Sequence, residues 1–586
     1  SSSYNLRPRK SLNYNEKSMF NKVFDEELKT SSHNKLPKIN KTSILSPKKR
    51  TQPKNINKIN PKKRTTNFSY WSPVLKTRNR YINLKGWSSL VSATKLKNFL
   101  IKDPCLDWYK HHMIKKNIGK FNVKEDDPVK REEVDLMMNT LLEKVNNNKT
   151  GKSPLNILFE CGNLFERKVI EDIKSKFPGM VARTDYHKEF ALNHADTIKC
   201  MKQGIPFIEQ AGLYDEDIGI FGTADLLVRS DYLNCLTNHK YIGHKELVKC
   251  PYINNNYHYV VIDIKWSTME LCSNGLNIRN NGLYRAYKGQ LAIYNVIVGK
   301  IQNYIPMKAY VMGKGFKFTK QSDKIKYFYE GISYDDRLGE VDYSSFDNNL
   351  IELVKEAIEW VWKVRAEGAQ WSCIPPDVAE LYPNMCNSRY DAPYHGLKKK
   401  HAEYIKEITL LWNVGVKHRE RAHKKGITRY DDPRLTAEIM GITGKSAKII
   451  NGMLGMIQNP TKIIEPKYVK NNLDNWQTKS DLEFYVDFET CNTCFVDKEN
   501  MDIFNRKHKS VQDYIFMIGV GYEENGVFHY NCFKTEDTSM ESEFNNMKNF
   551  IQFIEQLTGI LQDLTVEIWD IVGRNRSMKH SRTVIL

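Results

Sequence analysis

The chain has 586 residues, 40% of them hydrophobic, and a net charge of +20 from 89 Lys and Arg against 69 Asp and Glu. This length allows three or four domains with buried cores, and the charge favours a polyanionic partner. No run of 18 apolar residues and no secretory segment is found, and eleven cysteines follow no disulfide framework, so we expect an intracellular protein with free thiols and no membrane span.

Residues 1–70 are predicted to form a disordered basic arm. Residues 1–64 hold 17 Lys and Arg against 4 Asp and Glu and contain few large apolar side chains, so burial cannot offset the entropy of ordering. The sequence PKKR occurs twice, which favours nucleic-acid binding or a nuclear-import signal, with a nuclear or viral-factory location; a solubilising tail is the alternative. The basic residues concerned are Lys48, Lys49, Arg50, Lys62, Lys63 and Arg64.

Alternating helix and strand patterns follow from about residue 87 to 345. The run before Asp263 is almost wholly apolar, as expected of a strand covered on both faces. The mixture predicts an α/β domain with a mixed sheet. Expected helices begin at an N-cap Ser92 and end at Asp103-Pro104, cover 154–177, and cover 285–298 with an end at Gly299; expected strands cover 218–229, 258–264 and 308–313.

Three acids and one lysine fall in this domain in an order that suits phosphodiester hydrolysis. Glu166 lies on a predicted helix, Asp225 interrupts an apolar strand, and Asp263 and Lys265 end the next strand. A buried charged pair is costly unless it pairs or coordinates a cation. We expect Asp225 and Asp263 to hold Mg²⁺, helped by Glu166 and the carbonyl of Ile264. Lys265 would lower the pKa of the attacking water or stabilise charge on phosphorus.

Two polar residues on the next predicted helix complete this set. Gln290 and Tyr294 are four residues apart and therefore share a face, where an amide and a phenol can orient the substrate strand or hold the carboxylates. An Asp-x-Lys triplet alone is common by chance. The order of the pieces is the stronger observation.

The segments GNLFE, GTADLLV, VIDIK and QLAIY, spread over about 155–315, resemble the motifs of the PD-(D/E)xK superfamily in its RecB-like branch with the Gln-x-x-x-Tyr motif. The resemblance implies a restriction-endonuclease-like core and DNA cleavage that depends on Mg²⁺ or Mn²⁺. It also implies a catalytic role for Glu166, Asp225, Asp263 and Lys265 and a supporting role for Gln290 and Tyr294. A folded but inactive relative is the alternative.

The cysteines do not favour a further cofactor. Some RecB-like nucleases hold an iron–sulfur cluster with one early and three late cysteines, but here Cys105, Cys373 and Cys386 include no Cys-x-x-Cys pair, so we predict no cluster. A second set has zinc-like spacing but few turn glycines, and we do not favour zinc there. That set is Cys235, His239, His244 and Cys250.

Residues 346–475 are predicted to be a helical connector that opens with an amphipathic helix at 350–366. Within it Gly415 and Gly426 lie eleven residues apart around a basic helix, and a glycine turn between short helices can offer N–H groups to a phosphate. The segment is similar to a helix-hairpin-helix element; an ordinary helical linker is the alternative. The basic residues expected to contact nucleic acid are Lys417, Arg419, Lys424 and Lys425.

Residues 481–570 are predicted to form a partial RNase H-like α/β domain of three strands, a helix at 541–557 and a strand at 564–569. Asp487 and Glu489 share a face of the first strand and repel each other unless a cation lies between them. The sequence FYVDFET resembles the first motif of DnaQ-like 3′–5′ exonucleases, which some RecB-like proteins carry at their C-terminus. Only Asp570 follows among the acids that such a site needs, and 571–586 is an irregular basic tail, so we expect a truncated domain with a doubtful second site.

These patterns predict a Mg-dependent deoxyribonuclease for DNA repair, recombination or replication, acting on single-stranded or duplex DNA. A non-catalytic nucleic-acid-binding or scaffold protein is the alternative, and RNA is a possible substrate. Endonuclease or exonuclease action, polarity and protein partners do not follow from the sequence.

Overall fold

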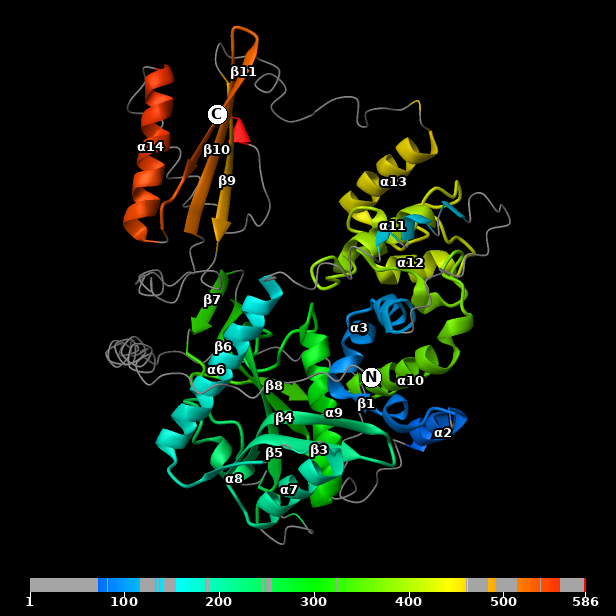
Figure 1. The fold of residues 1–586 in the computed structure, drawn as a ribbon, viewed down its shortest axis with the longest axis vertical. Coiled ribbons are helices and arrows are strands. Elements are labelled where there is room, and N and C mark those ends of the chain that lie inside the picture. Colours follow the sequence, from blue (N-terminus) through cyan, green and yellow to red (C-terminus); the bar gives the residue numbers. More distant parts are fainter. Residues whose placement is uncertain are drawn as a thin grey trace, which may run out of the picture. The chain divides into compact units, whose positions relative to one another are not determined.

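A computed structural model gives the fold shown in Figure 1. It describes residues 72–115, pieces of 132–141, 154–322, 325–459, 483–491, 514–558 and 584–585, apart from brief gaps inside these ranges. The predicted arm of 1–70, the predicted strand at 564–569 and Asp570 lie outside the described residues. Of the helices described, none is long and apolar enough to cross a membrane.

An eight-stranded mixed sheet forms the first α/β region, which confirms the predicted mixed α/β class. Its strand order is β2–β3–β4–β5–β6–β7, with β1 paired to β4 and β8 paired to β6. The pairs β2–β3, β5–β6 and β1–β4 are parallel, and the others are antiparallel. The strands are β1 (Val91–Ser92), β2 (Val181–Arg183), β3 (Phe207–Asp215), β4 (Ile220–Arg229), β5 (Tyr259–Glu270), β6 (Lys308–Ser322), β7 (Ile325–Gly331) and β8 (Gly339–Asp342).

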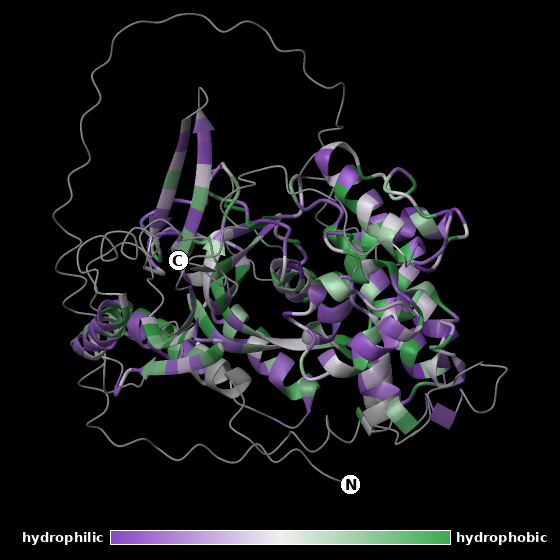
Figure 2. Ribbon diagram, turned by 90° about the horizontal axis from the view of Figure 1, so that it is seen from above, coloured by the Kyte–Doolittle hydropathy of each residue, from purple (hydrophilic) through white to green (hydrophobic). Residues whose placement is uncertain are grey.

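Separate hydrophobic clusters cover the two faces of this sheet. On one face α6 (Pro154–Lys176) packs Val169 against Ile262 of β5. On the other face α9 (Tyr284–Gln302) packs Leu291 in a cluster with Val261. Hydrophobic and hydrophilic segments alternate along the helices in Figure 2, as amphipathic helices require. The long apolar run of β5 therefore results from burial on both faces.

One predicted helix boundary in this region is wrong, and another is confirmed in position but not in its side-chain cap. Gly299 does not end its helix, because α9 continues to Gln302 and is followed by Asn303 in the left-handed conformation, with φ +52°. A Cβ at Gly299 would lie 2.5 Å from Cγ1 of Ile305, so close packing accounts for this glycine. Ser92, the last residue of β1, is the N-cap of a 3-10 turn at 93–96 that leads into the short helix α3 (Lys97–Leu100), but its side chain makes no capping hydrogen bond.

Packing continues across residue 345, the predicted end of the first domain. Helix α10 (Leu350–Glu367) places Val354 and Trp362 in the same cluster as α9. Further along, Lys398 Nζ lies 2.8 Å from Asp103 and 2.7 Å from Asp391, and all three side chains are buried. Segments on both sides of residue 345 therefore share one core and one buried ion network.

The segment predicted to be helical, 395–457, contains α11 (His395–Tyr404), α12 (Val416–His423) and α13 (Gly444–Gln458) and no described strand. Small helices and turns here enclose a cluster that includes Val414, Ala422 and Leu454. The predicted change from mixed to helical structure is confirmed.

A second sheet follows, in the order β11–β10–β9–β12, with antiparallel pairs. Its elements are β9 (Phe484–Cys491), β10 (Tyr514–Glu524), β11 (Val527–Lys534), α14 (Met540–Thr558) and β12 (Val584–Ile585). Helix α14 packs Phe550 and Ile554 against Val486 and Ile518. Three strands followed by a helix agree with the predicted order.

Candidate active site

The predicted acids meet where strand β4 changes its neighbour. On this edge β4 pairs with β1 at Ile220 and Phe221, and with β5 from Leu226 onward. Asp225 lies between these two ladders, and its Oδ2 accepts a hydrogen bond of 2.7 Å from the backbone N–H of Ile264 on β5. The Asp225 side chain therefore bridges the two strands and is fixed beside Asp263. The side chain of Ile264 is buried in the α6-side cluster.

Lys265 lies between the two carboxylates. Its Nζ is 2.7 Å from Oδ1 of Asp263 and 3.6 Å from Oδ2 of Asp225. The Asp263 side chain is fully buried, whereas the Lys265 side chain is 22% exposed. Two acids thus flank one largely buried ammonium.

The surroundings shift the pKa values of Asp263, Glu166 and Lys265. Burial raises the pKa of Asp263 to about 7; Lys265 opposes this rise and Asp225 adds to it. Burial also raises the pKa of Glu166 to about 7, with a contribution from Asp225. Burial alone lowers the pKa of Lys265, but the charges of Asp263 and Asp225 outweigh it and raise that pKa. Two carboxyl groups therefore change charge near neutral pH, a property that concentrates at functional sites.

Glu166 on α6 is held by a residue that sequence reasoning missed. Its Oε1 accepts a hydrogen bond from the side-chain amide of Gln210 on β3. The backbone of Gln210 has φ +55°, and its carbonyl accepts a 2.6 Å hydrogen bond from Thr184 Oγ1. A left-handed glutamine costs about 1–2 kcal/mol. Strain of this kind persists where the surroundings fix it, often at functional sites.

Helix α9 supports the acids from the other side, as predicted for Gln290 and Tyr294. The Nε2 atom of Gln290 donates to the Tyr294 hydroxyl at 2.9 Å and lies 3.5 Å from Oδ1 of Asp263. Tyr294 is 2% exposed, and burial raises its pKa. A Cβ at Gly222 of β4 would lie 2.6 Å from Cε1 of Tyr294. The glycine of GTADLLV therefore makes room for the tyrosine of QLAIY.

The donor set fits a hard divalent cation. The second oxygen of Asp263, Oδ2, is buried and has no hydrogen-bond partner among the described residues. Mg²⁺ takes one or two protein carboxylates and keeps several waters. Asp225 and Asp263 supply that number. Glu166 lies close enough to Asp225 for the charge of Asp225 to raise the pKa of Glu166. Within the described ranges no group of three or more His, Cys, Asp or Glu side chains is placed to hold a metal ion together.

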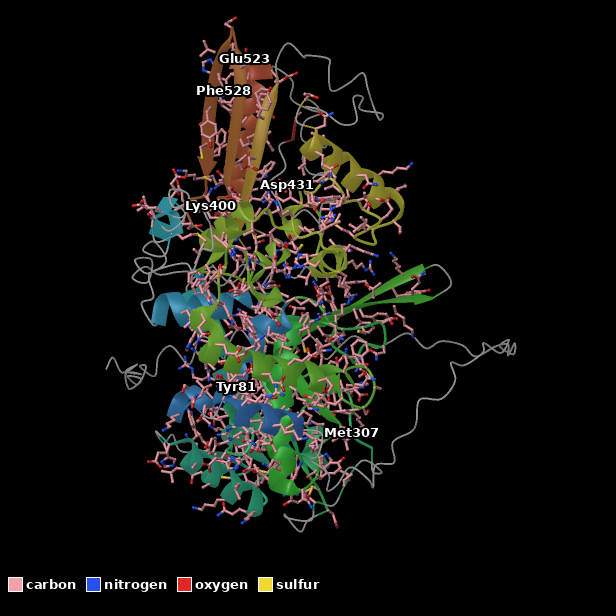
Figure 3. The ribbon with its side chains drawn as sticks, turned by 90° about the vertical axis from the view of Figure 1, so that its right-hand side faces the viewer. Tyr81, Met307, Lys400, Asp431, Glu523 and Phe528 are labelled. Atoms are coloured by element: carbon pink, nitrogen blue, oxygen red, sulfur yellow. The ribbon has the colours of Figure 1, made fainter. Side chains whose placement is uncertain are left out.

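The second acidic pair lies on β9 in a different setting. Asp487 and Glu489 are both exposed, while the alternating Phe484 and Val486 are buried toward α14. The two acids share a face, as their spacing predicts. Phe528, labelled in Figure 3, is another exposed side chain of this sheet.

The predicted nucleic-acid contacts of the helical segment divide into two kinds. Lys417, Lys424 and Lys425 are exposed on or next to α12. Arg419 differs from the prediction, because it is buried and donates to Glu407 at 3.1 Å and to the Pro383 carbonyl at 2.8 Å. Its guanidinium therefore stabilises the fold. The six basic residues of the arm lie outside the described residues.

The predicted cysteine and histidine sets are distributed as follows. Cys105 and Cys373 are buried in one hydrophobic cluster, while Cys386 is exposed and its thiol donates to the Val414 carbonyl at 3.2 Å. In the zinc-like set Cys235 is exposed and Cys250 is buried. Burial raises the pKa of the Cys250 thiol to about 12. His239 packs against Tyr241, and His244 lies outside the described residues.

Comparisons with protein-family models, with curated proteins and with solved structures found no match for this chain. The functional argument therefore depends on the chemistry and geometry of the site.

Proposed function

We propose that the chain is a deoxyribonuclease that depends on Mg²⁺ or Mn²⁺ and acts in DNA repair, recombination or replication. The observation that supports it best is the arrangement of Asp225 and Asp263 around Lys265, with one buried oxygen of Asp263 left without a partner. In this proposal the first sheet and its helices are a restriction-endonuclease-like core that resembles the RecB-like branch. The net charge of +20 supports a polyanionic substrate.

Each residue of the site has a distinct role in hydrolysis. A divalent ion held by Asp225 and Asp263 would polarise a phosphate oxygen and activate a water. The ammonium of Lys265, held between the two carboxylates, would stabilise negative charge that grows on the phosphate. Glu166 is suited to accept a proton from the attacking water, because its pKa is about 7. Gln290 and Tyr294 hold Asp263 in position from α9.

The test uses the full chain and end-labelled single-stranded, duplex and branched DNA, with RNA beside them, in Mg²⁺, Mn²⁺ or EDTA. Asp263→Asn and Lys265→Met are the test variants. Asp217→Asn is the matched control, because the Asp217 side chain is 77% exposed on the same domain. We expect metal-dependent cleavage by the wild type and the control and its loss in both test variants.

Two results contradict the proposal. One is the absence of metal-dependent product on every substrate. The other is cleavage that survives equally in Asp263→Asn and Lys265→Met, since it would come from another site or a contaminant. Binding that weakens steeply with salt, without any product, would favour the non-catalytic nucleic-acid-binding alternative.

A further inference from the structure

The hairpin made by the second half of β6 and by β7 exposes three consecutive aromatic side chains. Tyr327 is 45% exposed, Phe328 60% and Tyr329 43%. In Figure 3 the two green strands of this hairpin extend outward from the body of their domain. Along a strand the faces alternate, so Tyr327 and Tyr329 share one face of the hairpin and Phe328 lies on the other. Single exposed apolar side chains are ordinary on protein surfaces, but paired exposed rings on a projecting hairpin mark an interaction site.

Three aromatic side chains on one face of this hairpin stack on one another. The rings of Phe318 and Tyr329, which face each other across the ladder, are 4.7 Å apart and nearly parallel, at 9°. Phe316 lies 6.1 Å from Phe318 at 22°, and Phe316 itself is buried. The guanidinium of Arg337 lies 5.2 Å from the Phe316 ring. The stack of rings is therefore anchored by the buried Phe316 at one end and exposes Tyr329 at the other.

The charges beside these rings are mainly positive. Lys320 faces Tyr327 across the ladder, and Lys326, next to Tyr327 on β7, projects from the opposite face of the hairpin. Both lysines are exposed, and no ion pair is recorded for either among the residues that the structure describes. Glu330 is the acid of the described part of β7. Exposed aromatic rings next to unneutralised lysines are the combination that binds single-stranded nucleic acid, since rings stack on bases and lysines attract phosphates.

The hairpin continues directly from the strand that borders the candidate active site. Lys265 pairs with Gly313 of β6, and the strand then runs on to Phe318 and Lys320, which face Tyr329 and Tyr327. At about 3.3 Å per residue, the two tyrosines lie roughly 17 and 23 Å along the strand from the level of Lys265. A DNA strand bound at the active site could reach the two tyrosines within a few nucleotides.

We propose that the β6–β7 hairpin binds single-stranded DNA, with bases stacked on Tyr327 and Tyr329 and phosphates attracted by Lys320 and Lys326. The inference rests on the proposed nuclease function and narrows its substrate to DNA with a single-stranded part next to the cut. A protein partner or a second copy of the chain could also cover aromatic rings, but the adjacent lysines and the continuity with the acids favour a polyanion.

The test measures binding by fluorescence anisotropy in EDTA, so that binding is separated from cleavage. The probes are labelled dT20 and a 20-base-pair duplex, and the variant is Tyr327→Ser with Tyr329→Ser in the full chain. Phe544→Ser is the control, because Phe544 is 60% exposed on α14 of the other sheet. We expect the Kd for dT20 to rise about tenfold or more, and the Kd for the duplex and the control to change less than about threefold.

An unchanged Kd for dT20 would overturn the inference, and so would an equal loss on the duplex. A fall from dimer to monomer mass in light scattering would assign the hairpin to contact between copies. The nuclease proposal is tested separately, by cleavage with the wild-type chain, whose hairpin is intact. Failure of that proposal can therefore be distinguished from failure of the hairpin to bind single-stranded DNA. Circular dichroism of the variant should be unchanged, because both replaced side chains are exposed.

Discussion

Two acidic pairs lie within strands of this chain, one on β4 and β5 and one on β9, and their surroundings differ. Asp263 is fully buried, has Lys265 at 2.7 Å and has a pKa near 7. Asp487 and Glu489 are exposed on the face of β9 opposite its buried residues. Sequence motifs alone mark both pairs. A carboxylate pair becomes suited to catalysis when burial, a counter-charge and supporting side chains converge on it.

The strongest test of this contrast removes one charge from the first pair and both charges from the second. Asp263→Asn should lower metal-dependent cleavage on the order of 10³-fold, because it removes a ligand and the partner of Lys265. The double variant Asp487→Asn with Glu489→Gln should stay within about threefold of the wild type. Initial rates on one labelled substrate measure both. Loss of cleavage in the double variant with a near-normal Asp263→Asn would reverse the assignment of the two pairs.

A second test uses the raised pKa of Asp263. In the unfolded chain this carboxyl has its ordinary pKa of 3.8, and in the folded chain about 7. The folded state therefore holds the extra proton between these values, so stability falls as pH rises from about 4 to 7 and levels off above. Relative to Asp263→Asn, the wild type should lose on the order of 1–4 kcal/mol of unfolding free energy between pH 5 and pH 8.

Urea titrations in EDTA at several pH values measure this loss. Added Mg²⁺ should restore stability to the wild type at pH 8 and leave Asp263→Asn unchanged, since an ion that binds only the folded wild type stabilises it alone. A parallel pH dependence in the two proteins would mean that Asp263 is not the buried acid inferred.

The sequence predicted the elements of the site better than its supporting contacts. An apolar run followed by Asp-x-Lys was enough to place Asp263 and Lys265 on β5, and a spacing of four was enough to place Gln290 and Tyr294 on one face of α9. Both are short-range patterns with a known period. Asp225 lies between the residues of β4 that pair with β1 and those that pair with β5. This position depends on which strands pair, and no local sequence pattern predicts it.

Other features could not be foreseen for similar reasons. Gln210 adopts φ +55°, which residue type does not predict for glutamine, and its strand β3 was not predicted. Arg419 belongs to a basic helix, but the buried Glu407 that it contacts lies on a neighbouring segment, so its burial is a property of tertiary packing. Gly299 followed the usual preference of glycine for helix ends, while packing against Ile305 decided its position.

A third test compares two glycines of the predicted motifs. Gly222→Ala places a Cβ 2.6 Å from the Tyr294 ring, so it should displace that ring, lower cleavage about tenfold and destabilise the fold by about 1–3 kcal/mol. Gly162→Ala on α6 is the matched control, because nothing lies within 4 Å of its Cβ and alanine favours a helix. Cleavage rates and urea midpoints measure both. Equal effects of the two variants would show that Gly222 makes no specific room for Tyr294.

The smallest expected effect separates strain at the site from strain elsewhere. Gln210→Gly relieves a left-handed backbone but removes the amide that holds Glu166, so stability should rise by about 0.5–1 kcal/mol while cleavage falls about fivefold. Asn525→Gly, at φ +51° in the β10–β11 turn, should change stability by a few tenths of a kcal/mol and leave cleavage unaltered, since asparagine tolerates this conformation. Urea titrations and cleavage rates on the same preparations give both quantities. If Gln210→Gly instead loses stability and keeps full activity, the glutamine serves the packing of β3. The strained backbone of Gln210, beside Glu166, would then have no part in the chemistry of the site.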